Sequence, residues 1–350
     1  MKTVVFTGGG TAGHVIPNLA LISQIKRNGA EVYYIGSYTG IEKEMIGHAG
    51  VEYFAISSGK LRRYFSLKNF SDPFKILNGY IQARKVLKKL KPGAVFSKGG
   101  FVTVPVVYAA ESLGIPVILH ESDYTPGLAN KLSAPRAQKI CVSFEDTLKY
   151  TGEKGIYTGT PLRSELFAGD KKRGFAHLGF SGKKPVLLIM GGSLGAVAIN
   201  NAVEQNLDRL CEIFDIAHIR GADHINQNIK KTSYRQFEFI DDALPDVFAA
   251  ADIMLSRSGA NAVFEILALK IPALLIPLPL NASRGDQILN AQYCEKRGFS
   301  HVLPQEDMEN LYSALLDLYS KRSELIKNMS EHNLSDATKT ISDLILEYIK

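Results

Sequence analysis

The sequence lacks several features that mark particular classes of protein. Its 350 residues include only three cysteines, Cys141, Cys211 and Cys294, which lie far apart and form no C-x-x-C pair. This spacing indicates neither a disulfide framework nor a zinc site. No uncharged apolar run reaches the roughly eighteen residues that a membrane span needs, and the N-terminus leads into a strand-like stretch rather than a signal peptide. We therefore expect a cytosolic protein.

Positive charge is present but unevenly distributed. The net charge is +6, yet the segment from Lys60 to Lys91 holds ten basic residues and one acid, Asp72, which gives it +9 and leaves −3 for the rest. Such a segment suggests a polyanionic partner, either nucleic acid, an anionic membrane or a phosphorylated substrate.

The pattern of apolar residues predicts an α/β protein. A chain of 350 residues exceeds what one hydrophobic core normally serves, so two domains are expected. Strand-like runs alternate with amphipathic stretches, and the pattern restarts after a polar, basic stretch at 169–184. The expected strands are Thr3–Thr7, Glu31–Ile35, Ala94–Ser97 and Pro116–His120, then Pro185–Met190, Phe214–Ile219, Gln236–Ile240, Ile253–Leu255 and Ala273–Ile276.

This alternation predicts two tandem Rossmann-like domains, each a doubly wound parallel sheet. We place the first domain at residues 1–160 and the second at 161–334. The tail 335–350 reads as a helix with Ile341, Leu344, Ile345 and Ile349 on one side, which could pack back on the first domain.

Three glycine-rich loops follow expected strands. The first, Gly8–His14, formally satisfies G-x-G-x-x-G, but the acid that a dinucleotide site needs at the end of the second strand is missing, since Glu31 stands at its beginning. The others are Ser97–Phe101 and Met190–Ala196. Glycine loops before helices bind phosphates, and these lie in both halves, so the ligands are predicted to meet in a cleft between the domains.

Two further segments of the second half combine a turn with the start of a helix. In Ser256–Glu265, Glu265 could accept hydrogen bonds from two ribose hydroxyls, or could merely be an acid that favours the helix dipole. The segment Arg284–Asn290 carries polar groups of suitable length for a sugar, although on its own it could be surface.

Taken together, these motifs resemble the MurG-type glycosyltransferases of the GT-B fold over nearly the whole chain. The strings that carry the resemblance are G-G-T-A-G-H-V-I-P, S-K-G-G-F-V, H-E-S-D-Y-T-P-G-L-A-N-K, T-G-T-P-L-R, G-G-S-L-G-A, S-R-S-G-A-N-A-V-F-E and R-G-D-Q-I-L-N-A. The resemblance implies transfer of N-acetylglucosamine from its UDP sugar to undecaprenyl-diphosphate-linked N-acetylmuramoyl-pentapeptide, with an acceptor-binding first domain and a UDP-sugar-binding second domain.

The resemblance also assigns roles to residues. On the donor side it implies Arg163 and Ser193 at the UDP phosphates, Ile240 at the uracil, Ala260, Asn261 and Ala262 along the nucleotide, Glu265 at the ribose, and Gln287 and Asn290 at the sugar. It implies that Thr11, Ala12 and Gly13 close over the sugar, and that loops with Gly9, Gly10, Gly99 and Gly100 hold the acceptor diphosphate. Asp123 and Asp286 also fall at substrate positions, but many relatives have Asn and Gln there, and an ionised Asp only accepts hydrogen bonds.

The implied reaction needs a general base and positive groups, but no metal or cofactor. His14 lies where the family's proposed base lies, and imidazole titrates near neutrality. His120 is the second candidate, and each histidine could instead be structural. No D-x-D pair marks a metal site. Arg163 and the helix after Ser193 could balance the diphosphate charge.

The basic segment predicts a helix that starts near Asp72, with Ile76, Tyr80, Ala83, Leu87 and Leu90 packed inward. Apolar groups beside the basic ones are expected of a surface that rests on anionic lipid, peripherally at the cytoplasmic face of the membrane. The proposed contacts are Lys68, Phe70, Phe74, Lys75, Leu77, Arg84 and Lys85. The alternative is a solvated basic helix.

Other functions stay open from the sequence alone. One is transfer of a sugar to another membrane lipid such as diacylglycerol, and another is epimerisation of a UDP sugar. A nucleic-acid-binding module is disfavoured because the aromatic residues of the basic segment match no RNA-binding motif.

Overall fold

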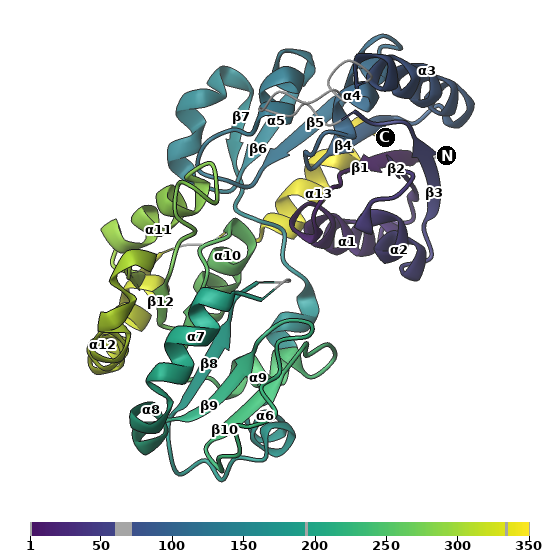
Figure 1. Cartoon of the computed structure of the whole chain (residues 1–350). Coiled ribbons are helices and arrows are strands. Elements are labelled where there is room, and N and C mark those ends of the chain that lie inside the picture. Colours follow the sequence, from purple (N-terminus) through teal and green to yellow (C-terminus); the bar gives the residue numbers. More distant parts are fainter. Residues whose placement is uncertain (1, 60–71, 193–194, 333–334, 350) are drawn as a thin grey trace. The chain divides into compact units, whose positions relative to one another are not determined.

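Two compact units make up the chain. The computed structural model describes residues 2–59, 72–192, 195–332 and 335–349. One unit contains Met1–Arg163 and Leu334–Lys350, and the other contains Ser164–Asn333. Figure 1 shows the elements of each. Lys68, Phe70 and Ser193, which the sequence assigned to membrane and phosphate contacts, lie outside the described residues.

The first unit is built on a seven-stranded parallel sheet in the order β3-β2-β1-β4-β5-β6-β7. Its strands are β1 (Thr3–Thr7), β2 (Glu31–Ser37), β3 (Glu52–Ile56), β4 (Ala94–Ser97), β5 (Val117–Glu121), β6 (Lys139–Val142) and β7 (Gly155–Tyr157). Its α-helices are α1 (Ala12–Arg27), α2 (Ile41–His48), α3 (Asp72–Leu90), α4 (Thr103–Glu111), α5 (Leu128–Ser133) and α13 (Ala337–Tyr348).

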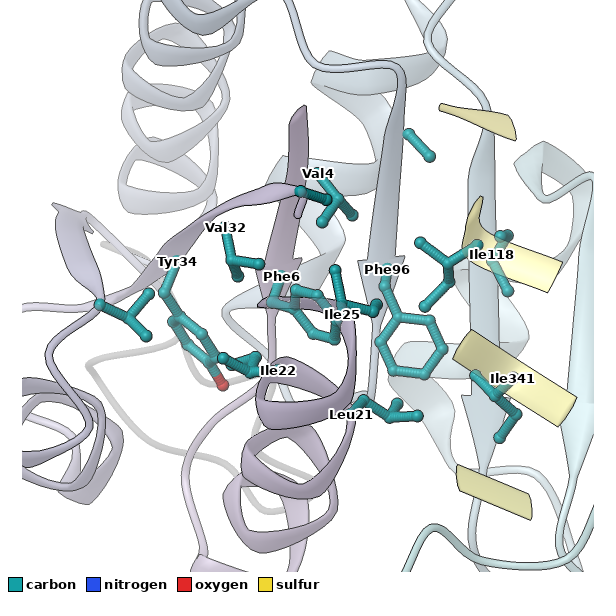
Figure 2. Packing of buried hydrophobic residues seen from close by; sticks show 14 of the residues in the cluster. Val4, Phe6, Leu21, Ile22, Ile25, Val32, Tyr34, Phe96, Ile118 and Ile341 are labelled. Carbon is teal, nitrogen blue, oxygen red and sulfur yellow. The ribbon is translucent and has the colours of Figure 1, made fainter. Parts of the chain in front are cut away.

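Apolar clusters pack on both faces of this sheet. One cluster joins β1 and β4 to α1, and the rings of Phe6 and Phe96 lie 5.3 Å apart between their centroids (Figure 2). Ile341 and Ile345 of α13 belong to the same cluster, so the last helix completes the core of the first unit. On the other face, Leu87 of α3 packs with residues of α4. Burial of these side chains supplies the main stabilisation of the unit.

The second unit has a six-stranded parallel sheet in the order β10-β9-β8-β11-β12-β13. Its strands are β8 (Val186–Met190), β9 (Asp215–Ile219), β10 (Tyr234–Phe237), β11 (Ile253–Ser256), β12 (Ala273–Leu275) and β13 (Ser300–Val302). Its α-helices are α6 (Lys171–Leu178), α7 (Val197–Gln205), α8 (Leu207–Ile213), α9 (Leu244–Ala250), α10 (Ala260–Leu269), α11 (Asp286–Lys296) and α12 (Leu311–Glu331). The prediction of two Rossmann-like parallel sheets is confirmed.

One expected strand is misplaced. The run Gln236–Ile240 was predicted as a strand, but β10 ends at Phe237. Phe237 pairs with Ile219, the last residue of β9, so residues 238–240 have no neighbouring strand to bond. Ile240 therefore lies in the loop beyond the sheet.

The strand orders locate a candidate ligand site in each unit. Strand order reverses between β1 and β4 in the first sheet and between β8 and β11 in the second. Open α/β sheets bind ligands at the carboxyl ends of the strands that flank such a switch point. The glycine loops after β1, β4 and β8 all lie at these positions. No helix in the described ranges combines the length and apolarity needed to span a bilayer.

Candidate active site

The first two glycine loops meet backbone to backbone at the switch point of the first unit. The amide of Gly9 donates to the carbonyl of Gly99 across 3.3 Å. Gly100 has φ of +92°, and a Cβ atom there would overlap the Gly9 carbonyl oxygen. A side chain at position 100 would therefore be both strained and obstructed.

His14 lies in the first turn of α1, half-buried, with Nδ1 3.1 Å from the hydroxyl oxygen of Thr11. Thr11 is the N-cap residue of α1, but its side chain makes no capping hydrogen bond. An N-cap threonine usually accepts from an amide of the first turn. Here the hydroxyl contacts the imidazole instead.

Buried polar groups hold the strand end below this loop. Tyr34 donates to the carbonyl of Gly8 across 2.8 Å, and Asn18 donates to the Tyr34 hydroxyl across 3.1 Å. Glu42 of α2 accepts a hydrogen bond from the amide of Gly10 across 3.2 Å. The amides of Gly9 and Gly10, which the sequence assigned to diphosphate binding, thus both donate to groups of the protein itself.

His120, the second candidate for the base, lies in a fully buried network. Its Nε2 is 3.0 Å from the carbonyl oxygen of Gly159, and its Nδ1 is 2.8 Å from Nζ of Lys98. Because a carbonyl only accepts, Nε2 carries the proton and Nδ1 accepts from Lys98. Burial and the neighbouring Lys98 hold the pKa of His120 well below its usual range.

Lys98 belongs to the second glycine loop, Ser97–Phe101, and its ammonium bonds groups on and after the neighbouring strand β5. Its ammonium also contacts the hydroxyl of Ser122, so it links the end of β4 to the segment after β5. Burial lowers the pKa of Lys98 to about 8, although Glu121 and Asp123 oppose this shift. Two consecutive residues beyond it, Gly99 and Gly100, have positive φ. Their amides make no hydrogen bond to the described part of the chain.

Glu121 organises the loop that contains Asp123. Its carboxylate accepts from the amides of Asp123 and Gly127 and from the side chain of Asn130, at 3.0, 2.9 and 2.8 Å. The sequence reasoning did not single out Glu121 or Lys98. Both lie in strings that carry the resemblance, and each is a charged residue at the end of an apolar strand.

In the second unit, the start of α10 lies against the start of α11. Ser258 donates to the carbonyl of Gln287 across 2.7 Å, and Asn290 donates to the carbonyl of Ser258 across 3.1 Å. Gln287 accepts from the amide of Leu278 across 3.1 Å. The structure thus brings Gln287 and Asn290 beside the helix that carries Glu265, and it buries Asn290 completely.

The residues at the start of α10 are placed at the switch point as well. Gly259 is the N-cap and offers no side chain, while Ala260, Asn261 and Ala262 form the first turn. Glu265 is half-buried in the following turn. A helix N-terminus with this geometry favours an anion or a polar ligand.

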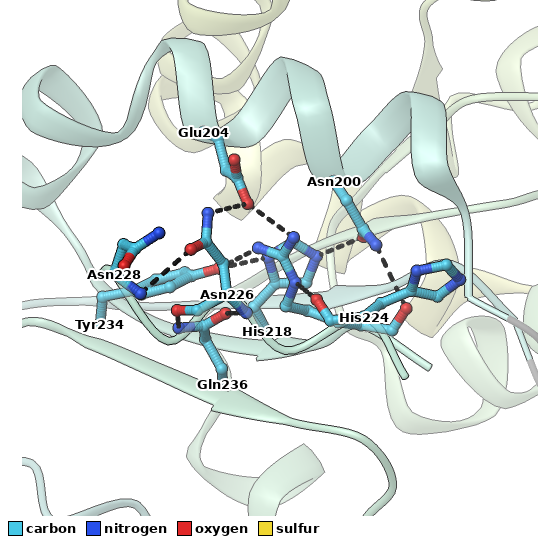
Figure 3. A network of polar contacts seen from close by, with 9 residues as sticks. Asn200, Glu204, His218, His224, Asn226, Asn228, Tyr234 and Gln236 are labelled. Carbon is cyan, nitrogen blue, oxygen red and sulfur yellow. Dashed lines mark hydrogen bonds and ion pairs between the residues drawn. The ribbon is translucent and has the colours of Figure 1, made fainter. Parts of the chain in front are cut away.

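A polar network supports the loop after β8 (Figure 3). His218 bonds Tyr234 through Nδ1 and Asn200 through Nε2, at 2.8 and 3.0 Å. Arg220 pairs with Glu204 at 2.6 Å, and a Cβ atom at Gly195 would overlap the Arg220 carbonyl oxygen. The network fixes the end of β9 against Gly195 and α7. Sequence periodicity gave no sign of it.

Three further residues that the sequence assigned to the donor are placed as follows. Arg163 ends the first segment of the first unit, and its Nε atom is buried without a partner in the described ranges. Ile240 is buried in the loop after β10. Asp286 opens α11 and forms an ion pair with Arg284 at 2.6 Å.

Comparisons with known proteins assign the family. Residues 4–142 match the glycosyltransferase family 28 N-terminal domain, and residues 186–344 match the C-terminal domain of that family. The chain belongs to glycosyltransferase family 28. This glycosyltransferase is 53% identical over 354 residues to the UDP-N-acetylglucosamine--N-acetylmuramyl-(pentapeptide) pyrophosphoryl-undecaprenol N-acetylglucosamine transferase of Clostridium botulinum (strain Kyoto / Type A2), covering 100% of both chains. The enzyme of the same name from Lachnospira eligens is 52% identical over 100% of both.

Two solved structures are similar over nearly the whole chain. MurG of Acinetobacter baumannii is 26% identical to this family 28 glycosyltransferase with a TM-score of 0.76, over 99% of this chain and 100% of that one. The UDP-GlcNAc 2-epimerase of Neisseria meningitidis has a TM-score of 0.69 over 99% of this chain and 100% of that one, but only 17% identity. The second likeness concerns the fold alone.

Proposed function

We propose that this family 28 glycosyltransferase transfers N-acetylglucosamine from UDP-N-acetylglucosamine to the 4-hydroxyl of undecaprenyl-diphosphate-linked N-acetylmuramoyl-pentapeptide. The observation that carries the proposal is the 53% identity over the whole chain to an enzyme of that name. Glycine loops at both switch points support it, because they suit ligands with phosphate groups.

The donor is assigned to the second unit and to Arg163. Glu265 takes the ribose hydroxyls from the second turn of α10, whose first turn lines the nucleotide. The unpartnered Nε of Arg163 suits a phosphate oxygen, because a guanidinium binds phosphate through charge-assisted hydrogen bonds. Ser193, Ile240 and Gln287 keep the phosphate, uracil and sugar roles proposed from the resemblance.

The acceptor is assigned to the first unit. The amides of Gly99 and Gly100 make no hydrogen bond within the described part of the chain, so both can donate to an anion. Because Gly9 and Gly10 already donate within the protein, we assign the acceptor diphosphate to the second loop. The buried Lys98 beneath it adds positive charge.

The proposed base is His14. It takes the proton from the acceptor 4-hydroxyl while that oxygen attacks the anomeric carbon, and the bond to UDP breaks with its electron pair leaving on the diphosphate. Attack from the side opposite to UDP inverts the anomeric configuration. His120 is unsuited to this step, because its ring is 0% exposed and both nitrogens have partners inside the protein.

A membrane surface is the third proposed partner. The inward stripe predicted for α3 is confirmed at Ala83 and Leu87, which are fully buried. On another side of α3, Phe74, Leu77 and Ile81 are 75%, 58% and 57% exposed at a spacing that places them on one face. Lysines and arginines adjoin this stripe, so the helix suits peripheral binding to anionic lipid at the cytoplasmic face. Nucleic acid is not proposed as a partner.

One assay tests the function. Release of UDP is measured with UDP-N-acetylglucosamine or UDP-glucose, each with and without a polyprenyl-diphosphate-linked muramoyl-peptide acceptor. We expect release only with the N-acetylglucosamine donor and the acceptor together. Release of UDP when diacylglycerol replaces that acceptor would overturn the proposal in favour of a transferase for another membrane lipid. Recovery of epimerised donor without any acceptor would overturn it in favour of a UDP-sugar epimerase.

A further inference from the structure

Glu42 is a charged residue in the interior of the first unit that the proposed reaction does not use. It is the second residue of α2 and is 0% exposed. A carboxylate in such a place needs hydrogen bonds to offset the loss of water. One oxygen accepts from both the amide and the hydroxyl of Ser37, at 3.1 and 2.6 Å. The other accepts from the amide of Gly10 at 3.2 Å.

These bonds join α2 and the end of β2 to the loop after β1. Gly10 directly precedes Thr11 and the start of α1, so the bond from Glu42 lies one residue before the Thr11–His14 pair. The same loop is also held by Tyr34, which donates to the carbonyl of Gly8, two residues before Gly10.

The surrounding sequence is shaped to admit this carboxylate. A Cβ atom at Gly9 would lie 2.6 Å from the Glu42 carboxyl carbon, and one at Gly40 would overlap its oxygens. These two glycines therefore leave the space that the carboxylate occupies. Neither glycine has positive φ, so the need for glycine at these positions comes from the close approach of the carboxylate and not from the backbone conformation.

We propose that Glu42 is a positioning residue for the transfer reaction, whose carboxylate holds the Gly10 amide and thereby sets the place of Thr11 and His14. This inference rests on the proposed role of His14 as the base. A base has to lie within hydrogen-bond reach of the proton that it takes, and small displacements of catalytic groups cost large factors in rate.

The substitution Glu42→Gln tests the bond to Gly10 specifically. The amide keeps the shape but replaces one acceptor oxygen with an NH2 donor. If the remaining oxygen faces the two donors of Ser37, the NH2 group faces the Gly10 amide, and two donors repel. Ser37→Ala is the matched control, because it removes a donor from the same carboxylate and leaves the Gly10 contact intact.

Steady-state transfer, UDP affinity, melting temperature and hydrogen exchange of segment 8–14 are measured for each full-length variant. We expect Glu42→Gln to lower kcat at least tenfold, with the donor KM and UDP affinity within about threefold of the parent, and to speed exchange of the segment. Ser37→Ala should stay within twofold of the parent. In a His14→Ala background, Glu42→Gln should cause no further loss of kcat, since Glu42 is proposed to act only through His14.

A kcat within twofold of the parent, an equal loss in Ser37→Ala, or full additivity with His14→Ala would overturn the proposal. If Glu42→Gln does not fold, Gly9→Ala serves instead, because the added methyl group would displace the Glu42 carboxylate. An unchanged kcat in Gly9→Ala would also overturn the proposal. An inactive parent would refute the proposed function instead, and exchange of segment 8–14 would still decide whether Glu42 holds the loop.

Discussion

The hydroxyl of Thr11 lies 3.1 Å from Nδ1 of His14, where α1 begins. If Nδ1 carries the proton and donates to Thr11, Nε2 of the ring is the nitrogen that can accept a proton from a substrate. The threonine would then fix both the tautomer and the orientation of the proposed base.

We therefore expect His14→Ala to lower kcat by about 10²- to 10⁴-fold, the usual contribution of a general base. His14→Gln should be nearly as damaging, because an amide does not take up a proton at neutral pH. Thr11→Val should cost about threefold to tenfold in kcat, the worth of one hydrogen bond. UDP affinity, measured by calorimetry, should be unchanged in all three. A Gln variant with most of its activity would assign His14 to positioning only.

Glu265 provides a test of the donor site. If it accepts from the ribose hydroxyls, Glu265→Ala should raise the donor KM by about ten- to a hundredfold, since hydrogen bonds to a charged group are worth about 1.5–3 kcal/mol. The melting temperature without ligand should be close to that of the parent, and UDP but not NAD should raise it in the parent. An unchanged KM would leave Glu265 as an acid that only favours the helix dipole.

The exposed stripe of α3 predicts binding to vesicles. Burying one large apolar side chain is worth about 1.5–3 kcal/mol, so replacing both Phe74 and Leu77 with Ser should weaken binding to anionic vesicles at least tenfold. Phe167→Ser is the control, because Phe167 is 59% exposed but lies in the second unit. Changing Lys75, Arg84 and Lys85 to Glu should add a salt-dependent loss of about 1 kcal/mol for each residue. Equal vesicle binding by the parent and all variants would mean that α3 is a solvated basic helix that does not contact the membrane.

His218 makes stability depend on pH. Burial, and then Arg220, lower its pKa from 6.5 to about 3. As the pH falls below 6.5 the unfolded chain takes up a proton that the folded chain does not, so the free energy of unfolding falls by up to about 1.4 kcal/mol per pH unit until about pH 3. Urea unfolding at pH 7 and pH 5 should show a smaller loss for His218→Gln than for the parent. The exposed His48→Gln should behave as the parent does, and identical losses in all three would contradict the expectation.

Central strands could be predicted from the sequence because they are short apolar runs bounded by glycine. Thr3–Thr7 and Ala94–Ser97 have the predicted bounds. The strands that escaped prediction lie toward the sheet edges. Gly155–Tyr157 has three half-buried residues, too few to show a period of two. Near the sheet edges, the sequence pattern therefore missed strands or, for β10, misplaced one.

The site could be predicted only where its residues follow one another in the chain. Thr11 and His14 share a loop and a helix turn, so the motif reveals both. Glu42 is 32 residues from Gly10, and no local pattern joins them. Asn290 was predicted at the sugar from the same segment as Gln287, and its burial and its bond to the carbonyl of Ser258, 32 residues away, could not be predicted from that segment.

The packing of α13 bears on how the protein is made. Ile341, Ile345 and Ile349 complete the core that β1 and α1 begin, although the whole second unit is translated between them. The second unit, Ser164–Asn333, thus has all its elements in a chain that ends before α13, while the first unit lacks one of its helices. A released chain truncated before residue 337 should hold a protease-resistant second unit and a first unit with an exposed apolar face, a natural binding site for chaperones.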